Sequence, residues 1–336
     1  MKRAVLLVAL LATAAHADVW QRAIDTTDAT RDQYQLALGH ADDLVTRANA
    51  RSASRAEILR LVDTAIRFYQ EAAALRPNEA EPYFRIASVV DSFFVDCDGM
   101  RGARPLTCPP GGGLDPARGK QSLDAWEQFE KRAPLDPRIT ENLFSRAILR
   151  TKLVDSAKDP KPLLQGALRD YTAMLERWDG LSNVRQEGVW GNLAETYMML
   201  GRVEEAIDAY RVALDKGAGT STAYGLAVAL DRDDQGPAAL DLIKRQGPRA
   251  FLEFKQEVAI QNVFFVPEGE VYYYFALANE AFGYLDQAIA HWRLYMKSGA
   301  HPQFHARAKA HLEALALQKK QNPAPTRPPD DFDLLP

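Results

Sequence analysis

A run of apolar side chains at helical spacing, between Val189 and Gly217, constrains this chain more than any other feature. Trp190, Leu193 and Tyr197 fall at i, i+3 and i+7 and therefore lie on one face of a helix. Gly201 ends that helix. The spacing then repeats on a second helix through Ala206, Ile207, Tyr210, Ala213 and Leu214. The stretch predicts two helices that pack together through one apolar face.

A helix pair of this size cannot bury its apolar face alone, so further copies are expected along the chain. The segment 220–248 repeats the pattern: its Leu226, Ala227, Leu230 and Ala239 each lie 33 residues after Leu193, Ala194, Tyr197 and Ala206. A third copy occupies 269–302. Less regular copies of the same spacing precede these, over 63–90 and 124–137.

The unit resembles a tetratricopeptide repeat. The family pattern is met by Trp190, Leu193, Tyr197, Ala206 and Tyr210, while Ala194 replaces a glycine and Ala218 the closing proline. The resemblance covers most of the chain. It implies an all-α fold, a right-handed α-α superhelix of about six helix pairs with a capping helix over 303–317.

Segments that do not follow the repeat pattern divide the chain further. Long insertions in compact proteins are often functional. The expected organisation is a signal peptide over 1–17, a solenoid over 18–318 with its clearest repeats at 187–219, 220–248 and 269–302, insertions at 95–120 and 247–266, and a disordered proline-rich tail over 319–336.

The N-terminus has the pattern of an export signal. Lys2 and Arg3 precede an apolar run over 4–12, and Ala15-His16-Ala17 fits a small-x-small cleavage site. The run is shorter than the roughly 20 residues that span a bilayer, which argues against a membrane anchor. We therefore expect cleavage after Ala17 and a periplasmic or secreted protein.

Two cysteines, Cys97 and Cys108, are predicted to form a disulfide, because an exported chain enters an oxidising compartment. A redox-active pair is the alternative, but the spacing is not Cys-x-x-Cys.

Neither composition nor motifs favour catalysis or nucleic acid. Charged residues make up 26% and the net charge is -4, so no basic excess indicates nucleic acid or an anionic membrane. His301 and His305 are separated by Pro302, which does not fit a zinc helix. A calcium loop that begins at Asp96 has Thr107 where a carboxylate is needed. We expect no enzyme activity, no metal and no cofactor.

The resemblance implies a concave groove, lined by the first helices of the repeats, that receives a peptide or protein segment. Only Asn192 matches the family's clamp for C-terminal carboxylates, so a chaperone-tail ligand is not favoured. The aromatic segment over 264–266 fits a partner anchor or a carbohydrate platform less well than burial. The predicted groove residues are Phe84, Arg85, Asp91, Phe144, Lys152, Asn192, Glu195, Met199, Tyr224, Arg232, Tyr273 and Glu280.

The function that these observations favour is a non-enzymatic, exported scaffold for protein–protein interactions. It would serve the assembly or function of a cell-envelope complex, such as secretion, pilus, motility or outer-membrane machinery. The alternative is an accessory subunit that binds a small molecule or glycan in the groove or under the 95–120 insertion. An open groove favours the first and a ligand-sized pocket the second.

Overall fold

The computed structural model describes residues 29–50, 53–95, 107–108, 114–178, 184–260, 263 and 265–321. These residues are helical apart from turns and short connections, and they include no strand, which confirms the all-α fold. After a helix over 29–48 come α2 (Arg55–Leu75), α3 (Glu81–Val90), the π-helical turn η1 (Asp91–Val95), α4 (Pro116–Arg132), α5 (Arg138–Lys152), η2 (Val154–Ser156), α6 (Lys161–Glu176), α7 (Gln186–Met199), α8 (Val203–Asp215), α9 (Thr220–Arg232), α10 (Gly236–Ala259), η3 (Glu268–Glu270), α11 (Val271–Ala281), α12 (Leu285–Ser298), η4 (Pro302–Phe304) and α13 (His305–Gln321).

The chain divides into two compact units, the first with the helices up to α4 and the second with the helices from α5 onward. In the first unit, the helix over 29–48 packs on α2, where Tyr34 and Ala37 meet Ala72 in a small apolar cluster. α3 and α4 join through aromatic rings: the ring centroid of Phe84 lies 5.7 Å from that of Trp126. This unit therefore has its own apolar core.

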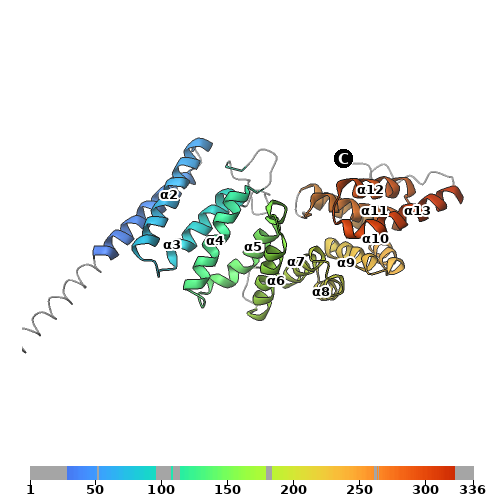
Figure 1. Ribbon diagram of the computed structural model, residues 1–336, viewed down its shortest axis with the longest axis horizontal. Coiled ribbons are helices and arrows are strands. Elements are labelled where there is room, and N and C mark those ends of the chain that lie inside the picture. Colours follow the sequence, from blue (N-terminus) through green and yellow to red (C-terminus); the bar gives the residue numbers. More distant parts are fainter. Residues whose placement is uncertain are drawn as a thin grey trace, which may run out of the picture. The chain divides into compact units, whose positions relative to one another are not determined.

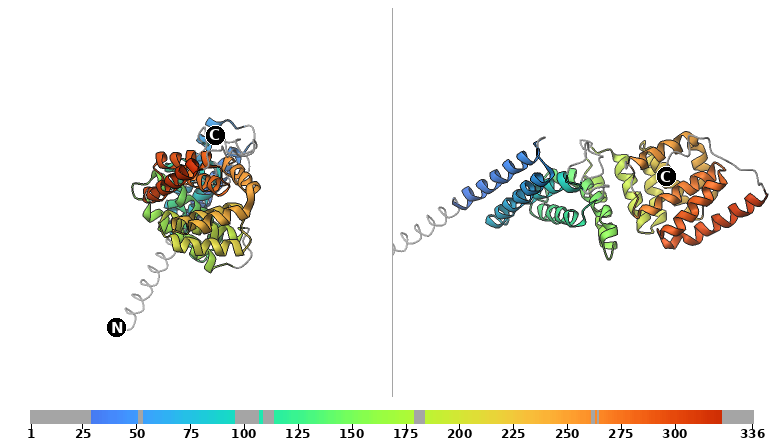
Figure 2. Two further views of the ribbon diagram at one scale, coloured as in Figure 1. Left: turned by 90° about the vertical axis from the view of Figure 1, so that its right-hand side faces the viewer. Right: turned by 90° about the horizontal axis from the view of Figure 1, so that it is seen from above.

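The second unit is built from successive helix pairs: α5 packs on α6, α7 on α8, α9 on α10, and α11 on α12 (Figure 1). Each first helix also contacts the first helix of the next pair, in the order α5, α7, α9 and α11. Figure 2 shows the last helices, in orange to red, side by side, and α13 packs on α12. This sequential stacking is the arrangement expected of a tetratricopeptide-like solenoid.

Small side chains lie where paired helices cross. A larger side chain at such a position would force the two backbones apart. The fully buried alanines at the crossings of the last three pairs are Ala194 and Ala206, Ala227 and Ala239, and Ala276 and Ala288, each 0% exposed.

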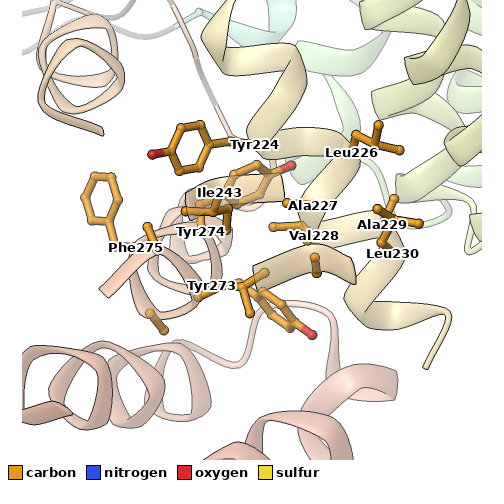
Figure 3. Close-up of a cluster of buried hydrophobic side chains, with 14 of the residues drawn as sticks. Tyr224, Leu226, Ala227, Val228, Ala229, Leu230, Ile243, Tyr273, Tyr274 and Phe275 are labelled. Atoms are coloured by element: carbon orange, nitrogen blue, oxygen red, sulfur yellow. The ribbon is translucent and has the colours of Figure 1, made fainter. Parts of the chain in front are cut away.

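The helix α10 bends sharply at Gly247, whose φ of 83° lies in the left-handed region that glycine tolerates best. Pro248 then begins a second helical stretch that reaches Ala259. This stretch occupies much of the insertion expected over 247–266. It adds Phe251 and Phe254 to the main core, so the insertion forms a helical arm that packs on the repeats. Figure 3 shows other residues of this core, with Tyr224 among them.

Several expectations lie at or beyond the edges of the described residues. Residues 1–17, most of the insertion at 95–120 and the end of the tail fall outside them. The helix α13 continues to Gln321, past residue 319 where the tail was expected to begin. In the described part of the chain, no helix is both long and apolar enough to cross a bilayer.

Candidate functional site

A cleft of about 230 Å³ opens in the second unit between the first helices of the repeats and the segment that follows the Gly247 bend. One side is formed by α7, where Asn192, Glu195 and Met199 line it, and by both ends of α9. Phe254 on α10 and Phe265, just before η3, also line it. The helical arm therefore contributes to the lining of the cleft.

Glu195 presents a carboxylate to this cleft. Its Oε1 accepts a hydrogen bond from the hydroxyl of Tyr210 on α8 and a second, of 3.3 Å, from the hydroxyl of Tyr274 on α11. Tyr210 reaches Glu195 because Gly225 leaves room: a Cβ at residue 225 would lie 2.6 Å from the Tyr210 ring. Burial raises the pKa of Glu195, and the two hydroxyl donors oppose this by stabilising its charged form.

Arg232 and Glu270 form a buried ion pair on another side of the same cleft. Nη2 of Arg232 lies 2.5 Å from Oε1 of Glu270, and the two side chains are 1% and 8% exposed. Oε2 of Glu270 has no hydrogen-bond partner and lies 3.8 Å from Nε2 of His301. Burial raises the pKa of Glu270 to about 7, although the Arg232 charge works against that rise.

His301 remains neutral in this setting. Burial, together with the nearby positive charge of Arg232, lowers the pKa of His301 to about 4. Besides the neutral His301, the ionisable groups of the cleft are the carboxyls of Glu195 and Glu270, whose pKa values burial raises, and the guanidinium of Arg232.

Aromatic rings complete the walls. Tyr274 lies edge-on to Phe265 at 4.9 Å between centroids and stacks on Phe254 at 5.9 Å. Such rings offer apolar surface, and their faces attract cations. The cleft thus combines a carboxylate-rich floor with aromatic walls.

The structure brings four of the predicted groove residues together in this cleft: Asn192, Glu195, Met199 and Arg232. All come from first helices of repeats, as the resemblance implied. Asn192 donates a hydrogen bond of 2.9 Å to the carbonyl oxygen of Gly188, one turn earlier in α7. Whether any of the four contacts a partner stays a prediction.

Tyr224 and Tyr273 do not lie on a surface. Both are 0% exposed. Figure 3 shows both tyrosines among the core side chains. Tyr224 stacks on Phe254 at 4.8 Å because the arm covers α9 there, and Tyr273 packs edge-on against Trp292 at 4.6 Å. The sequence-based expectation that these tyrosines line the groove is therefore corrected: they are core residues.

The remaining predicted residues are separate from the cleft. In the first unit, Phe84 packs on α4, Arg85 pairs with Glu81 at 2.7 Å and Asp42 at 3.3 Å, and Asp91 accepts a hydrogen bond of 2.8 Å from Trp126. In the second unit, Phe144 packs edge-on to Tyr171 at 6.1 Å and Lys152 ends α5 half-buried. Cys108 is buried, while Cys97 lies outside the described residues, so the predicted disulfide stays a prediction.

Three important cleft residues were not predicted to lie in the groove: Glu270, Tyr274 and His301. The sequence pattern raised His301 only as a metal ligand, and within the described residues no three histidine, cysteine or acidic side chains gather as a metal site requires. A hint for Glu270 was available, since it lies directly before the apolar run "VYYYFAL" at the start of a first helix. A charge at that position must find a partner when the helix packs.

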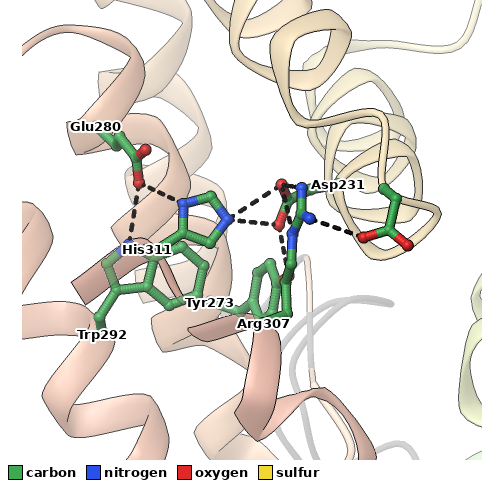
Figure 4. A network of polar contacts seen from close by, with 7 residues as sticks. Asp231, Tyr273, Glu280, Trp292, Arg307 and His311 are labelled. Carbon is green, nitrogen blue, oxygen red and sulfur yellow. Dashed lines mark hydrogen bonds and ion pairs between the residues drawn. The ribbon is translucent and has the colours of Figure 1, made fainter. Parts of the chain in front are cut away.

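A second polar network, whose residues do not line the cleft, surrounds His311 (Figure 4). Nδ1 of His311 lies 2.8 Å from Glu280, and its Nε2 lies 3.0 Å from Asp231, whose side chain is 0% exposed. Arg307 and the hydroxyl of Tyr273 also donate to Asp231, at 2.8 Å and 2.6 Å. The network holds the capping helix α13 on α9 and α11. The predicted groove residue Glu280 belongs to this network and does not line the cleft.

Comparison with known proteins gives structural neighbours only. No protein-family model matches the sequence, and no curated protein does. The C-terminal part of a TPR repeat-containing protein from Cytophaga hutchinsonii aligns at 15% identity and a TM-score of 0.41, covering 89% of this chain and 99% of that one. A tetratricopeptide repeat protein from Parabacteroides merdae aligns at 12% identity and a TM-score of 0.37, covering 85% of this chain and 99% of that one.

A chain of the APC/C hetero-tetramer Cut9–Hcn1 aligns at 12% identity and a TM-score of 0.38, over 85% of this chain and 46% of that one, so this chain spans about half its length. At these scores the alignments add no detail. The assignment of a tetratricopeptide-like helical fold rests on the paired helices described above.

Proposed function

We propose that this protein is a non-enzymatic scaffold that binds a segment of a protein partner in the cleft between α7, α9, α11 and the helical arm. The observation that carries this proposal is the gathering of first-helix side chains, Asn192, Glu195, Met199 and Arg232, around one opening. A stack of helix pairs presents such a surface to an extended segment of a partner.

The volume of the cleft favours a peptide over a small molecule. Sites for drug-sized ligands occupy about 300–1,000 Å³, whereas this cleft holds about 230 Å³. Such a space admits one or two side chains of a longer segment whose remainder lies outside. The accessory subunit for a small molecule or glycan is therefore the second candidate.

A photo-crosslinking amino acid at Asn192 tests this proposal. The matched control carries the same amino acid at Asp208, on α8, outside the residues that line the cleft and with its side chain 80% exposed. We expect a defined protein adduct from residue 192 in cells and none from residue 208. Equal adducts from both positions, or none from either, would contradict a partner in the cleft.

The cellular setting is part of the same proposal and rests on the N-terminal pattern alone. We propose export with cleavage after Ala17, a disulfide between Cys97 and Cys108, and a role in a cell-envelope complex. N-terminal sequencing of the purified protein should begin at Asp18, and thiol titration of the unreduced, denatured protein should detect no free thiol. A retained Met1 would refute export, and two free thiols would refute the disulfide.

A further inference from the structure

The cleft holds more buried acidic groups than basic ones. The carboxyl groups of Glu195 and Glu270 face one guanidinium, that of Arg232, and His301 is neutral. Glu270 lines the cleft with a side chain that is only 8% exposed, and its Oε2 is buried without a hydrogen-bond partner. An unpaired buried carboxylate oxygen is costly, so it is stabilised either by a proton or by a positive group that enters the cleft.

The surroundings suit a positive group on an apolar stem. Phe254, Phe265 and Tyr274 form walls against which methylene groups can pack, and ring faces attract a cation. Arg232 also has an unpaired atom, Nε, which is a donor of the kind that anions bind. However, the Arg232 side chain is 1% exposed and already paired with Glu270, and two carboxylates would repel an anion.

We propose that this pocket receives one lysine or arginine side chain of the partner segment, with its cationic head against Glu270 and Glu195 and its stem between the aromatic rings. This inference rests on the proposed function, because the side chain belongs to the peptide in the cleft. It assigns Glu270 and Glu195 as the residues that determine which segment is accepted.

Blocked tripeptides test the pocket with the wild-type protein. The probes are acetyl-Ala-X-Ala-amide with X as lysine, arginine, ε-acetyllysine, norleucine or glutamate, titrated into residues 18–336 and followed by calorimetry or ligand-observed NMR. We expect lysine and arginine to bind at least tenfold more tightly than the neutral and acidic probes. Equal binding of lysine and ε-acetyllysine, preference for glutamate, or no binding of the lysine probe would overturn the inference.

Variants that replace a carboxylate by a neutral amide test which residues bind the cationic side chain. Glu270→Gln and Glu195→Gln should each weaken the lysine probe about tenfold, while Glu204→Gln, at an exposed position on α8, should leave it unchanged. Circular dichroism and thermal unfolding of each variant show whether it is folded. If Glu270→Gln does not fold, Glu195→Gln and the ε-acetyllysine probe still decide the question.

Failure of this inference is distinguishable from failure of the proposed function. If the crosslink from residue 192 persists at full yield in Glu195→Gln and the probes show no preference for a cation, a partner binds the cleft but the cationic pocket is wrong. If no crosslink forms in the wild type, the proposed function itself is wrong.

Discussion

Nε2 of His311 lies 3.0 Å from Oδ2 of Asp231, and this contact joins the capping helix α13 to α9 across 80 residues of sequence. Asp231 is 0% exposed and His311 is 8% exposed. The ring of His311 also stacks on Trp292 at 4.6 Å, so its position is fixed by packing as well as by charge (Figure 4).

Removing the imidazole should strongly destabilise the fold. In His311→Ala, the carboxylate of Asp231 remains buried with one fewer positive partner, and breaking a buried pair typically costs about 3–5 kcal/mol. Urea unfolding should show that loss. An exposed charge on the same helix provides the control: Lys309→Ala should change the free energy of unfolding by less than about 0.5 kcal/mol. Similar values for the two variants would mean that the network does not hold α13.

The same pair predicts how stability depends on pH. Burial opposes the charge of His311, but the hydrogen bonds that the protonated ring donates to Asp231 and Glu280 outweigh this effect and raise the pKa of His311 to about 9. A raised pKa stabilises the fold fully below the unfolded value of about 6.5, and this contribution is lost as pH rises through about 9. The wild type should therefore lose more stability between pH 7 and pH 9.5 than His311→Gln does. Parallel curves would refute this.

At acid pH the contribution of Asp231 should disappear. Burial opposes its charge, but hydrogen bonds from His311 and Arg307 lower the pKa of Asp231 to about 2. A lowered pKa stabilises the fold above the unfolded value of about 3.8, and the contribution is lost as pH falls toward 2. Acid unfolding of wild type and Asp231→Asn should converge near pH 2. A difference that persists undiminished at that pH would contradict the assignment.

The glycine beneath Tyr210 should not accept a side chain. In Gly225→Ala, the added Cβ meets the Tyr210 ring at 2.6 Å, and overpacking of this kind costs roughly 1–3 kcal/mol. Gly191→Ala on α7 is the matched control, because its Cβ meets nothing closer than 3.5 Å. That variant should be stabilised by about 0.5–1 kcal/mol, since alanine favours helix over glycine. Thermal unfolding separates the two; equal effects would mean that Tyr210 moves aside freely.

Binding of the lysine probe should strengthen as pH rises from 6 to 8. The pKa of Glu270 is raised to about 7 by burial, so the carboxyl is largely protonated at pH 6 and cannot pair with a cation. The groups that face it are Arg232 on α9, Glu195 on α7, Tyr274 on α11, Tyr295 on α12 and the neutral His301. Calorimetry at the two pH values should show several-fold tighter binding at pH 8, and the gain should vanish in Glu270→Gln. A flat profile in the wild type would exclude Glu270 as the cation's partner.

The helix pairs were predictable from the sequence because their signal is local. Apolar residues at i, i+3, i+4 and i+7 specify which face of a helix is buried, and alanine at the crossings specifies which helix lies against it. Ala194 and Ala206 illustrate this, since the repeat pattern marks both as positions of close helix contact and both are fully buried.

The site was predictable only in part, because the groove was inferred from a repeat pattern that contains no extra helix. Where α10 continues beyond Gly247, Phe251 and Phe254 cover α9 and turn Tyr224 into a core residue. Glu270 and His301 come from connections between repeats, where the period gives no information about which side chains converge. Interactions between residues distant in sequence determined the cleft, and a local pattern does not record them.

Because of the bend at Gly247, different residues stack the helix pairs and form one wall of the cleft. In a plain repeat array, the same helices must do both. The stacking of helix pairs depends on alanine crossings, while one wall of the cleft is carried by the arm that follows the bend. Substitutions at Phe254 or Phe265 can therefore alter the width and chemistry of the cleft while the spacing between repeats stays constant. The choice of binding partner can therefore change through substitutions in the arm, while the packing of the helix pairs stays the same.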